Sequence, residues 1–205
     1  MLWLKPGGNV AGRFTGDRTG HPTFNHPDHP IPMQGEISLM AKILVAYASK
    51  QGSTAEIAQA IAQELQAAGH AADAADVAGV VSPAGYAGIV IGGPMYMGHI
   101  DPRVGKFMKR HAGELAKLPV AGFVVCLAAV SKDPEGMAWA EKALHKALAP
   151  VQPVAETIFA GKLEPEKLPW FQRWIIRRVN SPVGDFRDWD AIRAWAREVA
   201  GKMRV

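Results

Sequence analysis

The chain has one cysteine among its 205 residues, Cys126, so it cannot form an internal disulfide bond. A single cysteine is typical of proteins from a reducing compartment, and we expect a cytoplasmic protein. Cys126 lies in the apolar run 120–130, where a small buried hydrophobic residue is its usual role. The sequence also lacks any run of about 18 apolar residues, so we expect no membrane-spanning helix.

Several familiar motifs are absent as well. The glycine spacing fits neither the Walker loop GxxxxGK[ST] nor the dinucleotide motif GxGxxG. We also find no Ser–His–Asp set and no catalytic pair of carboxylates. Hydrophobic residues make up 48% of the chain, which is ample for a core in one domain. The net charge of +4 would suit a nucleic acid, a membrane surface or neither, and we predict no nucleic-acid partner.

The first 39 residues differ in composition from the rest of the chain. They contain many glycine, proline and histidine residues and no sustained apolar period, so they cannot bury enough surface to offset chain entropy. We predict a disordered extension over 1–39, native or from a mis-assigned start, and a folded domain over 40–205. We predict no metal site in the extension, because the spacing of its histidines matches no specific site: His21, His26 and His29.

From residue 41 onward, apolar segments of strand length alternate with segments of helical period. This alternation predicts an α/β fold with a parallel sheet and right-handed crossovers. The predicted strands are 42–48, 71–77, 88–92, 120–127 and 154–160. The predicted helices are 53–68, 102–111, 135–148 and 188–203.

The most informative segment is ILVAYASKQGST, residues 43–54. An apolar strand is followed at once by small hydroxyl residues and a glycine, and then by a helix. Backbone N–H groups can approach an anion closely at such a turn, and the positive end of the helix adds to the attraction. The pattern S-x-x-G-x-T therefore predicts a site for one terminal phosphate. The alternative is that Ser53 or Thr54 merely caps the helix.

This loop resembles that of the flavodoxin-like family, in which [ST]-x-[TQ]-G-x-T grips the phosphate of FMN. The resemblance implies a flavodoxin-like three-layer sandwich with a five-stranded parallel sheet of order 2-1-3-4-5. Ligands of such sheets lie beyond the carboxyl ends of the strands, at the switch point between strands one and three. The matching loop residues, with Lys50 between them, are Ser49, Gln51, Gly52, Ser53 and Thr54.

Two further segments follow predicted strands at the same edge, and the resemblance implies that they frame the isoalloxazine ring. Tyr96 offers a flat face on which a ring can stack. The alternative is that Tyr96 and its neighbouring methionines close the top of the core. The first segment is a predicted loop of Gly93, Pro94, Met95, Tyr96, Met97 and Gly98. The second is a predicted loop that includes Ala129, Val130 and Ser131.

A flavin carries the redox chemistry itself, so the protein tunes it mainly through nearby charge. Acidic and basic residues are mixed in both segments, as in His99–Arg103 and Lys132–Glu135. This mixture argues against a very low potential and favours electron transfer to a milder acceptor such as a quinone. His99 is a candidate donor to the reduced ring or a substrate, although a loop histidine is more often solvent-exposed.

An insertion over 161–187 separates the fifth predicted strand from the last helix by 27 residues, where about 2–6 are typical. Its central part, 168–179, predicts a short helix that is apolar, aromatic and basic. Such a helix suits a peripheral membrane contact or a substrate. The alternative is an ordinary docked helix with solvated arginines. The candidate residues are Trp170, Trp174, Arg173, Arg177 and Arg178.

The insertion sharpens the resemblance. The segments KFMKRHAGEL (106–115), FAGKL (159–163), WFQRWIIRR (170–178) and DWDAIRAWAREVA (188–200) are similar to menaquinone-dependent protoporphyrinogen oxidases. That family implies FMN, a quinone acceptor and oxidation of protoporphyrinogen IX in haem synthesis. We expect such an enzyme to lie peripherally on the inner face of the cell membrane. An FMN electron carrier between protein partners is the alternative, and a non-redox protein with a repurposed pocket is a third possibility.

Overall fold

The computed structural model describes residues 42–131, 133–167, 169–170, 173–174, 178 and 182–203. They belong to one compact unit, Leu39–Val205. The predicted extension over 1–39 lies outside the described residues, so its disorder stays a prediction.

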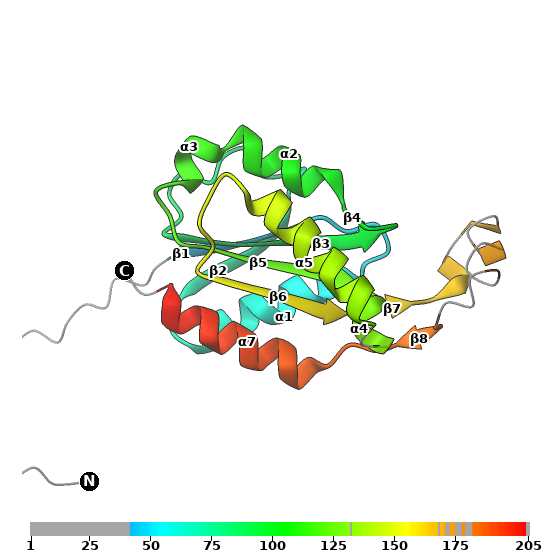
Figure 1. The fold of residues 1–205 in the computed structure, drawn as a ribbon. Helices are drawn as coiled ribbons and strands as arrows, with labels where there is room; N and C mark the ends of the chain where they lie inside the picture. The colour runs from blue at the N-terminus through cyan, green and yellow to red at the C-terminus, as the bar shows by residue number, and fades with distance from the viewer. Residues whose placement is uncertain are drawn as a thin grey trace, which may run out of the picture. The chain divides into compact units, whose positions relative to one another are not determined.

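Five parallel strands form the main sheet, in the order β2-β1-β3-β5-β6 (Figure 1). They are the five predicted strands in their predicted order, so the flavodoxin-like fold is confirmed. A short sixth strand, β4, pairs antiparallel with the end of β3 and was not predicted. The strands are β1 (Lys42–Tyr47), β2 (Ala71–Asp76), β3 (Gly88–Tyr96), β4 (His99–Ile100), β5 (Val120–Cys126) and β6 (Ala155–Ala160).

Helices cover both faces of this sheet, which gives three layers (Figure 1). Alternate residues of a strand face opposite sides, so Ile43 and Val45 join one apolar cluster while Leu44 and Ala46 join the other. Helices α1 (Ser53–Ala67) and α7 (Trp189–Lys202) cover the first face. The second face is covered by α2 (Pro102–Arg110), α3 (Ala112–Leu115) and α5 (Pro134–Leu148).

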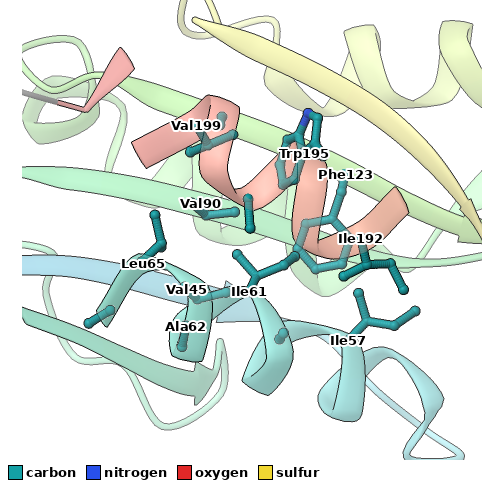
Figure 2. Close-up of a cluster of buried hydrophobic side chains, with 14 of the residues drawn as sticks. Val45, Ile57, Ile61, Ala62, Leu65, Val90, Phe123, Ile192, Trp195 and Val199 are labelled. Atoms are coloured by element: carbon teal, nitrogen blue, oxygen red, sulfur yellow. The ribbon is translucent and has the colours of Figure 1, made fainter. Parts of the chain in front are cut away.

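The core between the sheet and helices α1 and α7 is built around Phe123 of β5 (Figure 2). Its ring is fully buried and lies 6.3 Å from the ring of Trp195 and 6.0 Å from that of Phe159, between ring centroids. Ile57 and Ile61 of α1 contribute to the same cluster. Their i, i+4 spacing places both side chains on one face of the helix, which is why this part of the sequence predicts a buried helix.

Three helices begin at an aspartate whose side chain accepts a backbone hydrogen bond. Asp101 caps α2, Asp133 caps α5 and Asp188 caps α7. In α2 and α5 a proline follows the aspartate, where its missing N–H is not needed. These caps fix the start of each helix close to its predicted boundary.

The insertion between β6 and α7 has a small sheet at its base. Strands β7 (Lys162–Leu163) and β8 (Gly184–Asp185) pair antiparallel, and a turn of 3-10 helix, Pro165–Lys167, follows β7. Much of the predicted helix over 168–179 lies outside the described residues, Arg177 among them. The parts that are described as helical have exposed side chains: Trp170, Arg173, Trp174 and Arg178.

Candidate functional site

The turn between β1 and α1 has the geometry of an anion-binding loop. Gly52 has a φ of 88°, in the left-handed region that favours glycine, and its N–H donates to Ser49 Oγ at 3.1 Å. Gly52 is the N-cap of α1, and no side chain caps the helix. The hydroxyl-cap alternative for Ser53 and Thr54 is therefore not observed. The first amides of α1 are left for another acceptor, as at any uncapped helix start.

The two hydroxyl residues that open α1 have different surroundings. Thr54 is buried, with 2% of its surface exposed. Ser53 Oγ accepts a hydrogen bond of 3.2 Å from the N–H of Lys162, the first residue of β7. Ser53 therefore connects the loop 49–54 to the base of the insertion. Lys50 and Gln51, at the tip of the loop, are exposed.

The second predicted loop is wrong in its first half, because β3 continues through it to Tyr96. Pro94 pairs with Val125 of β5, and Tyr96 pairs with His99 of β4. These partners supply the backbone hydrogen bonds that keep 93–96 extended. Apolar patterning alone does not reveal such partners.

The strand turns back at Met97 and Gly98, whose φ values are 48° and 77°. Two consecutive positive φ values are the pattern of a type I′ hairpin turn. Met97 is 97% exposed and Tyr96 is 44% exposed, whereas Met95 is half-buried and packs against the apolar cluster on the α2 and α5 side. Met95 thus follows the core alternative, while Tyr96 and Met97 form an exposed rim. His99, the next residue, is exposed as well.

The third predicted loop is also wrong in conformation, because it forms a short helix, α4 (Ala128–Ser131). The N–H of Val130 donates to the oxygen of Leu127 at 3.0 Å, and Ser131 Oγ donates to the oxygen of Ala128 at 3.4 Å. These local bonds close a single helical turn directly after β5. Ala129 and Val130 are half-buried in it, and Ser131 is exposed.

Arg103, on the first turn of α2, connects the loop 49–54 to two carboxylates. Its Nη2 atom donates to the backbone oxygen of Ser49 at 3.0 Å and to Asp101 Oδ2 at 3.2 Å. Its Nε atom donates to Asp101 Oδ1 at 3.1 Å, and its Nη1 atom lies 3.4 Å from Asp76 Oδ2. This network was not predicted from the sequence, because its members are separated by up to 54 residues.

The charges in this network are closely balanced. Burial raises the pKa of Asp101, but hydrogen bonds from Arg103 and the charge of Lys50 outweigh it, and the net pKa is lowered. Asp101 is therefore ionised at neutral pH although its side chain is only 1% exposed. Burial and the Asp101 charge raise the pKa of the Tyr96 phenol, which stays protonated. The Lys50 ammonium lies 5.2 Å from the centre of the Tyr96 ring.

Two further residues lie near this edge, and neither was predicted from the sequence to be part of the site. Trp139 of α5 is 54% exposed and lies close to Gly98. If Gly98 had a side chain, its Cβ atom would be 3.8 Å from Trp139 Cε3. Arg187, whose side chain is 4% exposed, contacts Asp185 of β8 and donates to Glu56 Oε2 of α1 at 2.6 Å. The first residue extends the exposed rim at the hairpin, and the second ties the insertion to α1.

Cys126 is buried at the end of β5, as its apolar surroundings predict. Burial raises the pKa of its thiol, so it is a poor nucleophile. In the ranges that the structure describes, no helix has both the length and the apolarity needed to cross a membrane.

The structure therefore brings the three predicted segments to one edge of the sheet, where β1, β3 and β5 end (Figure 1). The insertion begins at the same edge, after β6. This edge contains the point at which the strand order reverses, because β2 lies on one side of β1 and β3 on the other. A crevice at such a point is where doubly wound sheets bind ligands.

Comparisons with known proteins agree with this geometry. A family model described as "Flavodoxin domain" matches residues 44–190. The protoporphyrinogen IX dehydrogenase [quinone] of Escherichia coli strain K12 is 29% identical, over 78% of this chain and 94% of that protein.

Solved structures show the same fold. Oxidised Flavodoxin 1 from Bacillus cereus aligns with a TM-score of 0.52 and 16% identity, over 78% of this chain and 98% of that one. The flavodoxin of Streptococcus pneumoniae TIGR4 aligns with a TM-score of 0.51 and 13% identity, over 79% of this chain and 99% of that one.

Proposed function

The chain belongs to the flavodoxin-domain family, and from that premise we propose that it is an FMN-dependent oxidoreductase. Its proposed reaction is the six-electron oxidation of protoporphyrinogen IX to protoporphyrin IX, with a quinone as electron acceptor. The observation that carries the proposal is that three segments converge where the strand order reverses. They are the loop 49–54, called the phosphate loop below, the hairpin of β3 and β4 that contains Tyr96, called the aromatic hairpin, and α4 directly after β5. The named activity of the Escherichia coli relative supports the choice of substrate and acceptor.

The loop 49–54 fits a phosphate group. Hydrogen-bond donors collect there, because α1 starts without a side-chain cap and Ser49 and Thr54 add hydroxyls. The positive end of α1 favours an anion at this place. Gly52 reaches the required left-handed conformation without strain. In our proposal, the backbone and hydroxyl groups of Ser49–Thr54 hold the phosphate of FMN, and Lys50 adds positive charge at the tip.

The hairpin and α4 fit the ring. Tyr96 presents a partly exposed aromatic face at the edge, and the left-handed turn at Met97 and Gly98 sets backbone groups beside it. On the other side, α4 offers Ala129, Val130 and Ser131. Bound FMN supplies two-electron transfer, so these residues bind, orient and shield it and need not act as acids or bases.

The charge around the hairpin fits a moderate reduction potential. A surplus of carboxylates near the ring would penalise the anionic reduced flavin. Here the negative charge of Asp101 is balanced by its ion pair with Arg103, and the Lys50 ammonium lies 4.0 Å from Asp101 Oδ2. The balance supports a flavin that passes its electrons to a quinone.

The insertion is our candidate for contact with the substrate or the membrane. Trp170 and Trp174 are 77% and 64% exposed, and Arg173 and Arg178 are exposed as well. Guanidinium groups suit the carboxylates of a porphyrin and the phosphates of lipid headgroups equally well. We propose that the protein lies in the cytoplasm and binds peripherally to the inner face of the cell membrane. Arg177 is expected to act in the same way.

The visible spectrum of the purified protein tests the cofactor, together with the mass of the molecule released on mild denaturation. We expect a yellow protein that releases FMN. The variant Thr54→Val should weaken FMN binding by about tenfold, since it removes one buried hydroxyl. Ser82→Ala, at a half-buried residue of the connection between β2 and β3, is the control. A colourless protein that takes up no added FMN would rule out the oxidoreductase.

An assay of porphyrin fluorescence tests the substrate, with protoporphyrinogen IX as reductant and a menaquinone analogue as acceptor. Fluorescence that rises with enzyme concentration, and only with the quinone present, is expected. The second candidate function is an electron carrier, and the exposed Tyr96 and Met97 favour it, because a partner protein could dock there. A bound, reducible flavin without porphyrinogen turnover would identify the carrier.

A further inference from the structure

Among the charged residues that the structure describes, Arg103 stands out because it joins three segments at the edge of the sheet. It contacts the end of β2 at Asp76, the phosphate loop at Ser49 and the cap of α2 at Asp101. All three nitrogens of its guanidinium take part. Arginine is suited to this task because its planar fork holds several acceptors at fixed angles.

We infer that Arg103 is a positioning residue that holds the Ser49–Lys50 peptide in the orientation needed to bind phosphate. The inference rests on the proposed binding of FMN. In a planar trans peptide, the carbonyl and the following N–H point in opposite directions. Because the Ser49 oxygen accepts from Arg103 Nη2, the N–H of Lys50 is directed away from the guanidinium. An anion in the loop finds that donor on the side opposite Arg103.

A second contact restrains the same residue from within the loop. The side chain of Ser49 accepts from the N–H of Gly52 at 3.1 Å, so Ser49 is fixed through its backbone oxygen and through its hydroxyl oxygen. Ser49 therefore requires little further ordering when the loop binds an anion. Pre-ordering of this kind raises affinity because less conformational freedom is lost on binding.

The same guanidinium also connects the phosphate loop with the aromatic hairpin. Asp101 accepts from Arg103 through both carboxylate oxygens, and its own N–H donates to the oxygen of Pro94 in β3 at 2.9 Å. Lys50 completes the link, because it lies near both Asp101 and the Tyr96 ring. Arg103 thus supports the phosphate half of the site directly and the ring half through Asp101.

The test compares FMN with riboflavin, which has the same ring but no phosphate. The apoprotein is titrated with each flavin, and the quenching of flavin fluorescence gives two dissociation constants. We expect Arg103→Met to weaken FMN binding by about tenfold and riboflavin binding by less than about threefold. The preference of the protein for the phosphorylated flavin should therefore fall. Arg103→Lys keeps the charge but loses the planar fork of the guanidinium. Its preference for FMN over riboflavin should be intermediate between those of the wild type and Arg103→Met.

Arg197→Met is the matched control, because Arg197 donates to Glu64 at 3.0 Å on the exposed side of α7, away from the site. It should leave both dissociation constants unchanged. If Arg103→Met does not fold, as judged by far-ultraviolet circular dichroism, Arg103→Lys still provides the comparison. A variant that keeps the full preference for FMN, or Arg103→Lys equal to the wild type, would overturn the inference.

A measurement without flavin separates this inference from the proposed function. We expect the amide of Gly52 to exchange hydrogen faster in apo Arg103→Met than in the apo wild type, because Ser49 has lost one of its two restraints. Unchanged exchange would contradict the positioning role. A wild type that binds neither flavin would instead contradict the proposed function.

Discussion

The phosphate loop and the insertion lie at the same edge of the sheet, but they are supported in different ways. The loop follows β1, whose central residues 43–46 are buried, and it leads into α1, which packs on the core through Ile57 and Ile61. In the described part of the chain, the contacts between the insertion and the rest of the domain include the Ser53–Lys162 hydrogen bond and the ion pair of Arg187 with Glu56. A loop supported by the apolar core is thus combined with a segment that is held by polar contacts at its base.

We expect this difference to divide the two regions by role: residues beneath the phosphate loop determine the stability of the domain, and exposed residues of the insertion determine what the protein binds. Substitutions beneath the loop remove apolar burial and should destabilise the whole domain. Substitutions in the exposed part of the insertion remove little burial and should change what the protein contacts. The following four experiments challenge this division, in order of decreasing expected effect.

Removal of the largest fully buried side chain, Phe123, should have the largest effect on the free energy of unfolding. Phe123→Ala leaves a cavity beside Trp195 and Phe159, and we expect a loss of about 3–5 kcal/mol in the free energy of unfolding, measured with urea. The matched change in the insertion, Trp174→Ala, should cost less than about 0.5 kcal/mol because this side chain is exposed. Equal losses from the two variants would contradict the division.

Substitution of Arg187 should have the next largest effect on the free energy of unfolding, because its buried side chain connects the insertion to α1. Arg187→Ala removes its bonds to Asp185 and Glu56, and we expect a loss of about 1–3 kcal/mol. Trypsin should also cleave within residues 161–187 faster than in the wild type. Arg193→Ala, on the half-exposed surface of α7, is the control. Unchanged cleavage would show that the base of the insertion is held by other contacts.

Asp101 makes the stability of the site depend on pH. Its folded pKa lies below its unfolded value, so its contribution is present above about pH 4 and is lost as the pH falls through the folded pKa. Asp101→Asn should cost about 1 kcal/mol at pH 7, and the difference from the wild type should shrink toward pH 3. Asp133→Asn makes the same change at the cap of α5, where the described residues include no arginine partner. A difference that stays constant with pH would contradict the charged pairing with Arg103.

The smallest effect on stability is expected from the exposed tryptophans. The double variant Trp170→Ser, Trp174→Ser should unfold within about 0.5 kcal/mol of the wild type. Its association with vesicles that contain anionic lipid should fall several-fold, as measured by co-sedimentation. The variant Val81→Ser changes an exposed apolar residue elsewhere and provides the comparison. Unchanged sedimentation of the first variant would show that the insertion is not the membrane contact.

The fold was predictable because its elements have strong local signals. Strand β5 is apolar throughout, and α1 repeats buried residues at helical spacing up to Gly69, a glycine with φ of 93°. The caps Asp101 and Asp188 are also visible in the sequence as an acidic residue before each helix. Local patterns of this kind depend on neighbours along the chain, which a sequence displays directly.

The site was predictable in its location but not in its contacts. The end of β3 is extended because Tyr96 pairs with His99, and no apolar period announces that pairing. Arg103 reads as an ordinary solvated residue at the start of a helix, yet its guanidinium reaches Ser49 across the edge of the sheet. Such contacts depend on which loops the topology brings together, and a single sequence contains no signal for them.

The pairing of β7 with β8 has a practical consequence for protein engineering. The chain enters and leaves the insertion through two neighbouring strands, at Lys162–Leu163 and Gly184–Asp185. We therefore expect that segments of other lengths can be grafted between these two points while the main sheet keeps its structure. Each doubling of the grafted length should cost only about 0.6 kcal/mol in closure entropy. Chimaeras built in this way would test whether the insertion sets the choice of substrate, while the loop 49–54 and the hairpin of β3 and β4 stay the same.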